Sequence, residues 1–230
     1  MRQTEEVTKN QHIIVYSHGF GTRKEDGHRI LADIAEALPE YSHILFDYCR
    51  IDEKTNTLFV RSIGEQAIIL NEAINKIRRT KPNAIIDIIG HSQGCIVAAF
   101  LKPSDIHKTL FIGAPAELTI INMQRVFTRI PGSIINLEGV SKLARSDGST
   151  TVVPKDYWRS ILDINPIDMY NKLSKVSSIT MINADQDEII GNKDFSKLSP
   201  SIKSININAD HDFTGASRTE MINIIRQELI

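Results

Sequence analysis

The feature that most constrains this chain is a Gly-x-Ser-x-Gly segment, GHSQG, at residues 90–94. The apolar, β-branched run 84–89 precedes it and predicts a buried strand. The apolar segment 95–101 follows it and predicts a helix. A strand, a glycine-flanked serine and a helix in this order are typical of a nucleophile elbow, which exposes the serine hydroxyl at the carboxyl end of a sheet. The alternative is a tight strand-to-helix turn in which Ser92 only caps the helix.

An elbow serine needs two further groups, which follow it in the order Ser, Asp or Glu, His. The run 177–183 predicts a strand that leads into the acidic loop sequence ADQDEII. The run 202–207 predicts another strand, and its loop ADHDF contains His211. Open α/β sheets bind their ligands at the carboxyl ends of the strands. We therefore expect Ser92, an acid and His211 to meet at that edge.

The elbow, the residue order and the two loops resemble the α/β-hydrolase superfamily. The similarity is greatest to its small esterases and to its lipase-like and aminopeptidase-like serine hydrolases. It extends from about His12 to the C-terminus and includes the segment SHGFG at 17–21. The resemblance implies a mostly parallel, doubly wound α/β sheet. Only about eleven residues precede the first predicted strand, 12–17, so the two leading strands usual in the superfamily are shortened or absent.

The resemblance also implies roles for individual residues. Ser92 would be the nucleophile and His211 its general base. Relatives place the acid three residues after a small residue and before an apolar pair, which indicates Asp187. Asp185 is the second choice and Glu188 the third. Many relatives carry another glycine after the elbow where this chain has Cys95, which concerns the packing of the helix.

In the family, the His-Gly-x loop and the elbow together form an oxyanion hole. By position, its donors here would be the backbone N–H groups of Phe20 and Gln93. Donors of this kind stabilise the negative charge that develops on the substrate oxygen. Because backbone amides would do this work, the resemblance implies neither a metal nor an organic cofactor.

The segment 116–176 interrupts the alternation of strands and helices at the place where the family inserts a cap. We therefore expect a hydrolase core made of 1–115 and 177–230, with 116–176 as a cap or lid. The segment contains Trp158, the only tryptophan of the chain. One hypothesis places Trp158 at the wall of an acyl pocket, and the alternative is that it packs the cap onto the core.

Size and charge agree with an enzyme that acts on small molecules. A chain of 230 residues can bury a sizeable core, and a formal net charge of -1 indicates no polyanionic partner such as nucleic acid. Four basic residues lie near the end of a predicted helix. They are interpreted as solvated side chains of its last turn, where the helix dipole favours positive charge. These residues are Lys76, Arg78, Arg79 and Lys81.

The two cysteines, Cys49 and Cys95, are expected to be free thiols in a reducing compartment. Residues 1–6 are polar and no apolar run is long enough to span a bilayer. These features favour a cytoplasmic protein without stable membrane insertion, and they do not determine its oligomeric state.

The sequence thus predicts a carboxylesterase-like serine hydrolase for esters of small or medium acyl groups. Thioesters, amides or peptides are alternative substrates of the same triad, and lyase or haloperoxidase chemistry on that triad is a further alternative. A non-catalytic binding protein with this fold is the alternative from another class. No His-Glu-x-x-His segment or other metal-ligand spacing is present, and there is no phosphate-binding Gly-x-x-x-x-Gly-Lys segment.

Overall fold

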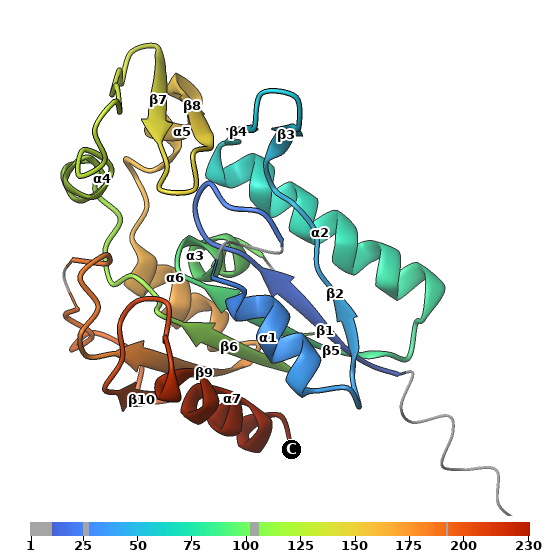
Figure 1. Ribbon diagram of the computed structural model, residues 1–230. Helices are drawn as coiled ribbons and strands as arrows, with labels where there is room; N and C mark the ends of the chain where they lie inside the picture. The colour runs from blue at the N-terminus through green and yellow to red at the C-terminus, as the bar shows by residue number, and fades with distance from the viewer. Residues whose placement is uncertain (1–10, 25–27, 102–105, 192) are drawn as a thin grey trace, which may run out of the picture.

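The computed structural model describes residues 11–24, 28–101, 106–191 and 193–230 as a three-layer α/β structure (Figure 1). All neighbouring strands of its central sheet are parallel, and their order is β10-β9-β6-β5-β1-β2. These strands are β1 (His12–Ser17), β2 (Ser42–Ile44), β5 (Ile85–His91), β6 (Lys108–Ile112), β9 (Ser178–Ala184) and β10 (Lys203–Ile207). In the described part of the chain β1 is the first strand, and the expected mostly parallel α/β fold class is confirmed.

Helices cover both faces of this sheet, which is why its central strands are nearly continuous apolar runs. On one face α1 (Ile30–Ala37) and α7 (Ala216–Leu229) pack over one apolar cluster. On the other face α2 (Ile63–Thr80), α3 (Gln93–Ala99) and α6 (Pro166–Leu173) pack over a second cluster. The strands β5 and β6, which lie before and after Ser92 in the sequence, are therefore packed between helices on both faces of the sheet.

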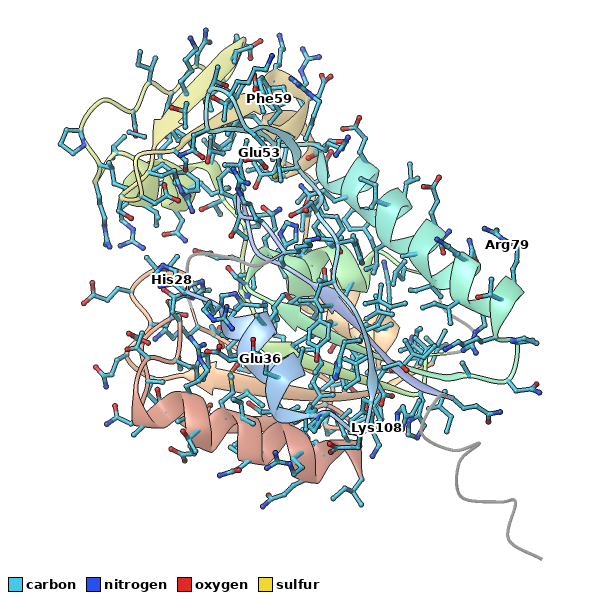
Figure 2. All side chains as sticks on the ribbon, turned by 45° about the vertical axis from the view of Figure 1, so that its right-hand side comes forward. His28, Glu36, Glu53, Phe59, Arg79 and Lys108 are labelled. Atoms are coloured by element: carbon cyan, nitrogen blue, oxygen red, sulfur yellow. The ribbon has the colours of Figure 1, made fainter. Side chains whose placement is uncertain are left out.

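The long helix α2 shows how local sequence sets an element boundary. Ser62 and Glu65 form a capping box, in which each side chain accepts the backbone N–H of the other residue. The basic residues that were expected to form a solvated helix end lie in its last turns, and Arg79 projects from that end (Figure 2).

A second, smaller sheet was not predicted from the sequence. It has the order β3-β4-β8-β7 and lies beyond the carboxyl ends of β1 and β5 (Figure 1). Its strands are β3 (Arg50–Asp52), β4 (Thr57–Phe59), β7 (Val140–Ala144) and β8 (Thr150–Pro154). The parallel pair of β4 and β8 joins a loop of the core to the inserted segment.

The inserted range 116–176 therefore contains two parts. In the first, α4 (Ile120–Phe127), β7, β8 and α5 (Lys155–Ser160) lie together over the carboxyl edge of the main sheet (Figure 1). The second part is α6, which packs against α3 within the core. The expected cap, which ends at 176, therefore includes α6, a helix that packs with the core.

None of the helices in the described ranges is both long and apolar enough to cross a lipid bilayer.

Candidate active site

Ser92 lies at the sharp turn between β5 and α3. Its φ of 54° and ψ of -127° are a conformation that residues with a Cβ rarely adopt, at a cost of about 1–3 kcal/mol. Two backbone hydrogen bonds hold this turn. The Ser92 N–H donates to the carbonyl of Ile112 on β6 at 2.9 Å, and the Cys95 N–H donates to the Ser92 carbonyl at 3.0 Å.

The residue at position 90 lets α3 fold back against β5. A Cβ on Gly90 would lie 3.1 Å from both Cα and N of Cys95. Cys95 itself is buried and carries a free thiol, as does Cys49, so the expectation of two unpaired cysteines is confirmed.

The structure brings three of the expected site residues together. The Nε2 atom of His211 lies 3.0 Å from the Oγ atom of Ser92, and its Nδ1 atom lies 2.6 Å from Oδ2 of Asp187. A neutral imidazole satisfies both contacts when Nδ1 carries the proton and Nε2 accepts from the serine. This is the arrangement that general-base activation of a serine requires.

Asp187 lies in the loop after β9, and its side chain has no exposed surface. Its Oδ1 accepts the backbone N–H groups of Ile189 and Ile190, at 2.8 and 3.1 Å. Burial acts to raise the pKa of Asp187, but the hydrogen bond and charge of His211 and the two amides outweigh it, so that the pKa lies below its ordinary value. The carboxylate is therefore held in its charged form with one oxygen left for His211.

The other acids of the two loops occupy different positions. Asp185 and Glu188 are exposed, and neither contacts His211. Asp210 accepts the N–H and the hydroxyl of Thr214, which is a turn interaction. Asp212 lies 3.5 Å from Nδ1 of His28 at the rim of the site.

The loop that follows β1 passes directly beside Ser92. A Cβ on Gly19 would lie 3.4 Å from the Ser92 Cβ, so the Gly19–Phe20 peptide runs along the serine. His18 orients this peptide. Its Nε2 accepts the N–H of Tyr48 at 3.0 Å, so Nδ1 carries the proton and donates to the Gly19 carbonyl at 2.9 Å.

The N–H of Phe20 belongs to the same peptide and points opposite to the Gly19 carbonyl. Fixing that carbonyl therefore also fixes the direction of the expected oxyanion donor. Burial lowers the pKa of His18, which keeps its ring in the neutral form that this pair of hydrogen bonds needs.

Gln93, the other expected donor, is the first residue of α3, so its backbone N–H has no acceptor within the helix. Its side chain is buried and belongs to a series of hydrogen bonds that the sequence did not reveal. Oε1 of Gln93 accepts the hydroxyl of Tyr157 at 2.5 Å, and its Nε2 donates to Gln66 Oε1 at 3.1 Å. Because Tyr157 lies on α5, these hydrogen bonds connect the inserted segment to the beginning of α3.

Ser92 and His211 border a cavity of about 340 Å³, which is within the usual range for small-molecule sites. Its apolar lining comes largely from the inserted segment and the loop after β9, including Leu118, Met123, Val126, Phe127, Ile130 and Ile190. Besides His91 and His211, four ionisable side chains border it, namely His28, Glu117, Arg145 and Asp212. A larger and shallower groove of about 840 Å³ between β2 and α2 contains none of the candidate catalytic residues.

Trp158 does not border this cavity. Its side chain is buried, and its indole N–H donates to Ser141 Oγ at 3.0 Å. The ring packs edge-on against Tyr157 within the apolar cluster that the insertion shares with the core. The structure thus places Trp158 in the packing of the inserted segment, as the alternative interpretation held, and not on the pocket wall.

One group of side chains in the described ranges has the composition of a metal site. His12, Asp87 and His107 offer ligand atoms that all lie within 4.8 Å of one another. The Asp87 carboxylate has no exposed surface and contacts both rings, at 2.5 Å and 3.1 Å. This trio lies at the amino ends of β1, β5 and β6, next to Lys108, whereas His28 borders the cavity at the other end (Figure 2). Local spacing gave no sign of it, because its members are far apart in the sequence and meet only through the pairing of three strands.

Comparison with protein families gives a match over residues 9–214 to the PGAP1-like alpha/beta domain. The chain belongs to this family. It also has the α/β-hydrolase fold of the superfamily that its motifs resemble. Among curated proteins, none matches the chain.

Solved structures with the same fold include several esterases and lipases. Est1E from Butyrivibrio proteoclasticus with bound ferulic acid is 17% identical, with a TM-score of 0.71 over 97% of this chain and 91% of that one. The monoacylglycerol lipase of Paleococcus ferrophilus is 14% identical, with a TM-score of 0.64 over 94% and 93% of the two chains. The esterase domain of a Rhodothermus marinus protein is also 14% identical, with a TM-score of 0.64 over 95% and 86%. At these identities the likeness concerns the fold.

Proposed function

We propose that this PGAP1-like domain is a serine hydrolase that cleaves carboxylic esters of small or medium acyl groups. The observation that carries the proposal is the continuous contact from Asp187 through His211 to Ser92 at the floor of a largely apolar cavity. The esterases and lipases among the structural neighbours support the same reaction class. A binding protein would need the cavity but not a buried acid behind a histidine.

In the proposed reaction, the Ser92 proton passes to Nε2 of His211 as Oγ forms a bond to the substrate carbonyl carbon. The carbonyl oxygen becomes an oxyanion and accepts the N–H groups of Phe20 and Gln93. Asp187 stabilises the imidazolium that results. When the tetrahedral intermediate collapses, the bond to the leaving alkoxide breaks and His211 returns the proton to it.

The acyl group is then attached to Ser92 Oγ. Water attacks this acyl-enzyme with His211 again accepting the proton, and the acid and the free serine are released. The reaction needs no co-reactant other than water. The substrate is thus a small acyl compound whose apolar part occupies the cavity that residues of α4 line.

The test is hydrolysis of p-nitrophenyl esters from acetyl to palmitoyl by the wild type and by Ser92→Ala. We expect turnover of the shorter esters that falls by several orders of magnitude in the variant, whose folding is checked by circular dichroism. An exposed loop serine outside the cavity, Ser196, serves as a matched control in Ser196→Ala. Equal turnover in the wild type and Ser92→Ala would reject the proposal, and turnover of thioesters or amides alone would change the substrate class.

A further inference from the structure

Arg145 is the cationic side chain of the cavity that the proposed reaction does not use. It directly follows β7 and opens the turn to β8. Its N–H donates to the Ser149 carbonyl at 3.1 Å, and its carbonyl accepts the Gly148 N–H at 3.1 Å. Since β8 is also paired with β4 of the core segment, the fold itself holds Arg145 at the edge of the cavity.

The guanidinium of Arg145 has no partner in the described chain. The guanidinium groups of Arg23, Arg29 and Arg218 each form an ion pair with a carboxylate, but no carboxylate of the described residues lies within ion-pair distance of Arg145. Burial lowers the pKa of Arg145, and the charges of Asp147 and Asp212 oppose this from beyond ion-pair distance. A guanidinium remains charged in proteins, so this side chain is partly removed from water without a carboxylate of the described residues in direct contact.

A structural role does not account for this arrangement. The turn is closed by its own backbone hydrogen bonds and by Asp147, whose Oδ1 accepts the Ser149 N–H at 2.9 Å. The guanidinium takes no part in these contacts. It borders the same cavity as the Ser92 hydroxyl, where a substrate would be bound.

We propose that Arg145 binds an anionic group of the substrate, so that the enzyme hydrolyses esters that carry a carboxylate or a phosphodiester. The proposal rests on the proposed ester hydrolysis at Ser92 and narrows its substrate class. The planar fork of an arginine matches the two oxygens of either group, and such charge-assisted pairs are stronger than neutral hydrogen bonds.

The other charges at the cavity favour a group with a single negative charge. Glu117 and Asp212 also border it, so two carboxylates lie near the proposed anion site. A doubly charged phosphomonoester would bring a second negative charge close to these carboxylates, which costs energy where water is partly excluded. A carboxylate or a phosphodiester avoids that cost.

The experiment compares pairs of esters in which only one member carries an anionic group. The first pair is p-nitrophenyl pentanoate and p-nitrophenyl glutarate half-ester, which place a methyl group or a carboxylate at the end of the same acyl chain. The second pair is monohexanoylglycerol and hexanoyl-glycerophosphoglycerol, which differ by a phosphodiester on the alcohol side. We expect kcat/KM to be about 10- to 100-fold higher for the charged member of at least one pair.

The variant Arg145→Gln is expected to remove this preference, and Arg145→Lys to restore part of it. Lys142→Gln removes a positive charge from the same hairpin at an exposed position, so it controls for the change in net charge and should leave the preference as it is. A preference in only the first pair would place the anion on the acyl side, and in only the second pair on the alcohol side.

The two proposals fail in different ways. Hydrolysis of the neutral esters with equal rates for charged ones, unchanged in Arg145→Gln, would overturn the anion site and leave the esterase proposal standing. If no ester were cleaved, the esterase proposal would fail. Calorimetric titration with monomethyl glutarate and methyl pentanoate would then still test the site, because equal binding of both by wild type and Arg145→Gln would overturn it.

Discussion

Gly94 lies so close to Ser17 that a Cβ at position 94 would come within 2.0 Å of the Ser17 carbonyl oxygen. The Ser17 hydroxyl also donates to the Gly94 carbonyl at 2.7 Å. The first turn of α3 therefore crosses the end of β1 in direct backbone contact. This contact brings the elbow that carries Ser92 beside the loop that carries Phe20.

The first prediction concerns this contact. Gly94→Ala should lower the free energy of unfolding by about 3 kcal/mol or more, because the added methyl group meets main-chain atoms that cannot move aside. The matched control is Gly64→Ala in the first turn of α2, where nothing lies within 4 Å of a new Cβ. That variant should be up to about 1 kcal/mol more stable than the wild type. Urea unfolding measures both, and similar effects at the two positions would contradict the close approach.

The second prediction separates the two leading candidates for the catalytic acid. Asp187→Asn should reduce kcat by about two to four orders of magnitude, because an amide at this position no longer holds the imidazole in the required tautomer. Asp185→Asn should stay within about threefold of the wild type, because the Asp185 side chain is exposed and does not reach His211. Steady-state hydrolysis of a p-nitrophenyl ester gives the ranking. The reverse order would move the acid to Asp185.

The third prediction treats His18 as a positioning residue. His18→Phe keeps a ring of similar size but removes the hydrogen bonds to Gly19 and Tyr48, which frees the Gly19–Phe20 peptide to rotate. We expect kcat to fall by about 10- to 100-fold with a much smaller change in KM, since an oxyanion donor acts on the transition state.

The control for His18 is His43→Phe. His43 also makes two hydrogen bonds, to Tyr16 and Leu38, but it lies on β2 away from the cavity. Both variants should lose some stability, and only His18→Phe should lose kcat. A matching loss of kcat in the two would mean that His18 acts only through stability.

The sequence was sufficient for the main sheet and for bringing Ser92, Asp187 and His211 to one edge of it, because both depend on local signals. The central strands are apolar runs, and the elbow is defined by a serine between two glycines at a strand-to-helix turn. Asp187 and His211 could be placed because each follows a strand end.

What the sequence did not reveal depends on contacts between distant segments. The strand β3 contains Arg50 and Asp52, so it has no strand-like apolar pattern and is recognised only by its pairing. Trp158 was placed beside the substrate as one hypothesis, since an aromatic side chain in an insertion gives no indication of which side it packs on. Arg145 lies in a polar turn sequence, and only the pairing of β4 with β8 brings it to the cavity.

The last prediction concerns pH and His91, the elbow residue before Ser92. His91 is buried, and its Nε2–H donates to the backbone carbonyl of His211 at 3.2 Å. Burial, followed by the repulsion of His211, lowers the pKa of His91 to about 3, although Asp187 acts in the opposite direction. The unfolded chain therefore binds a proton at this residue below about pH 6.5 that the folded chain does not bind.

The sign follows from proton linkage. Stability due to the neutral His91 is fully present above about pH 6.5 and decreases as the pH falls, by up to about 1.4 kcal/mol per unit. His91→Phe cannot take up this proton, so its free energy of unfolding should fall less steeply between pH 6.5 and 5 even if it is less stable at pH 7.5. Urea unfolding at several pH values gives both slopes. Parallel slopes for wild type and variant would show that His91 is protonated equally well in the folded and unfolded chain.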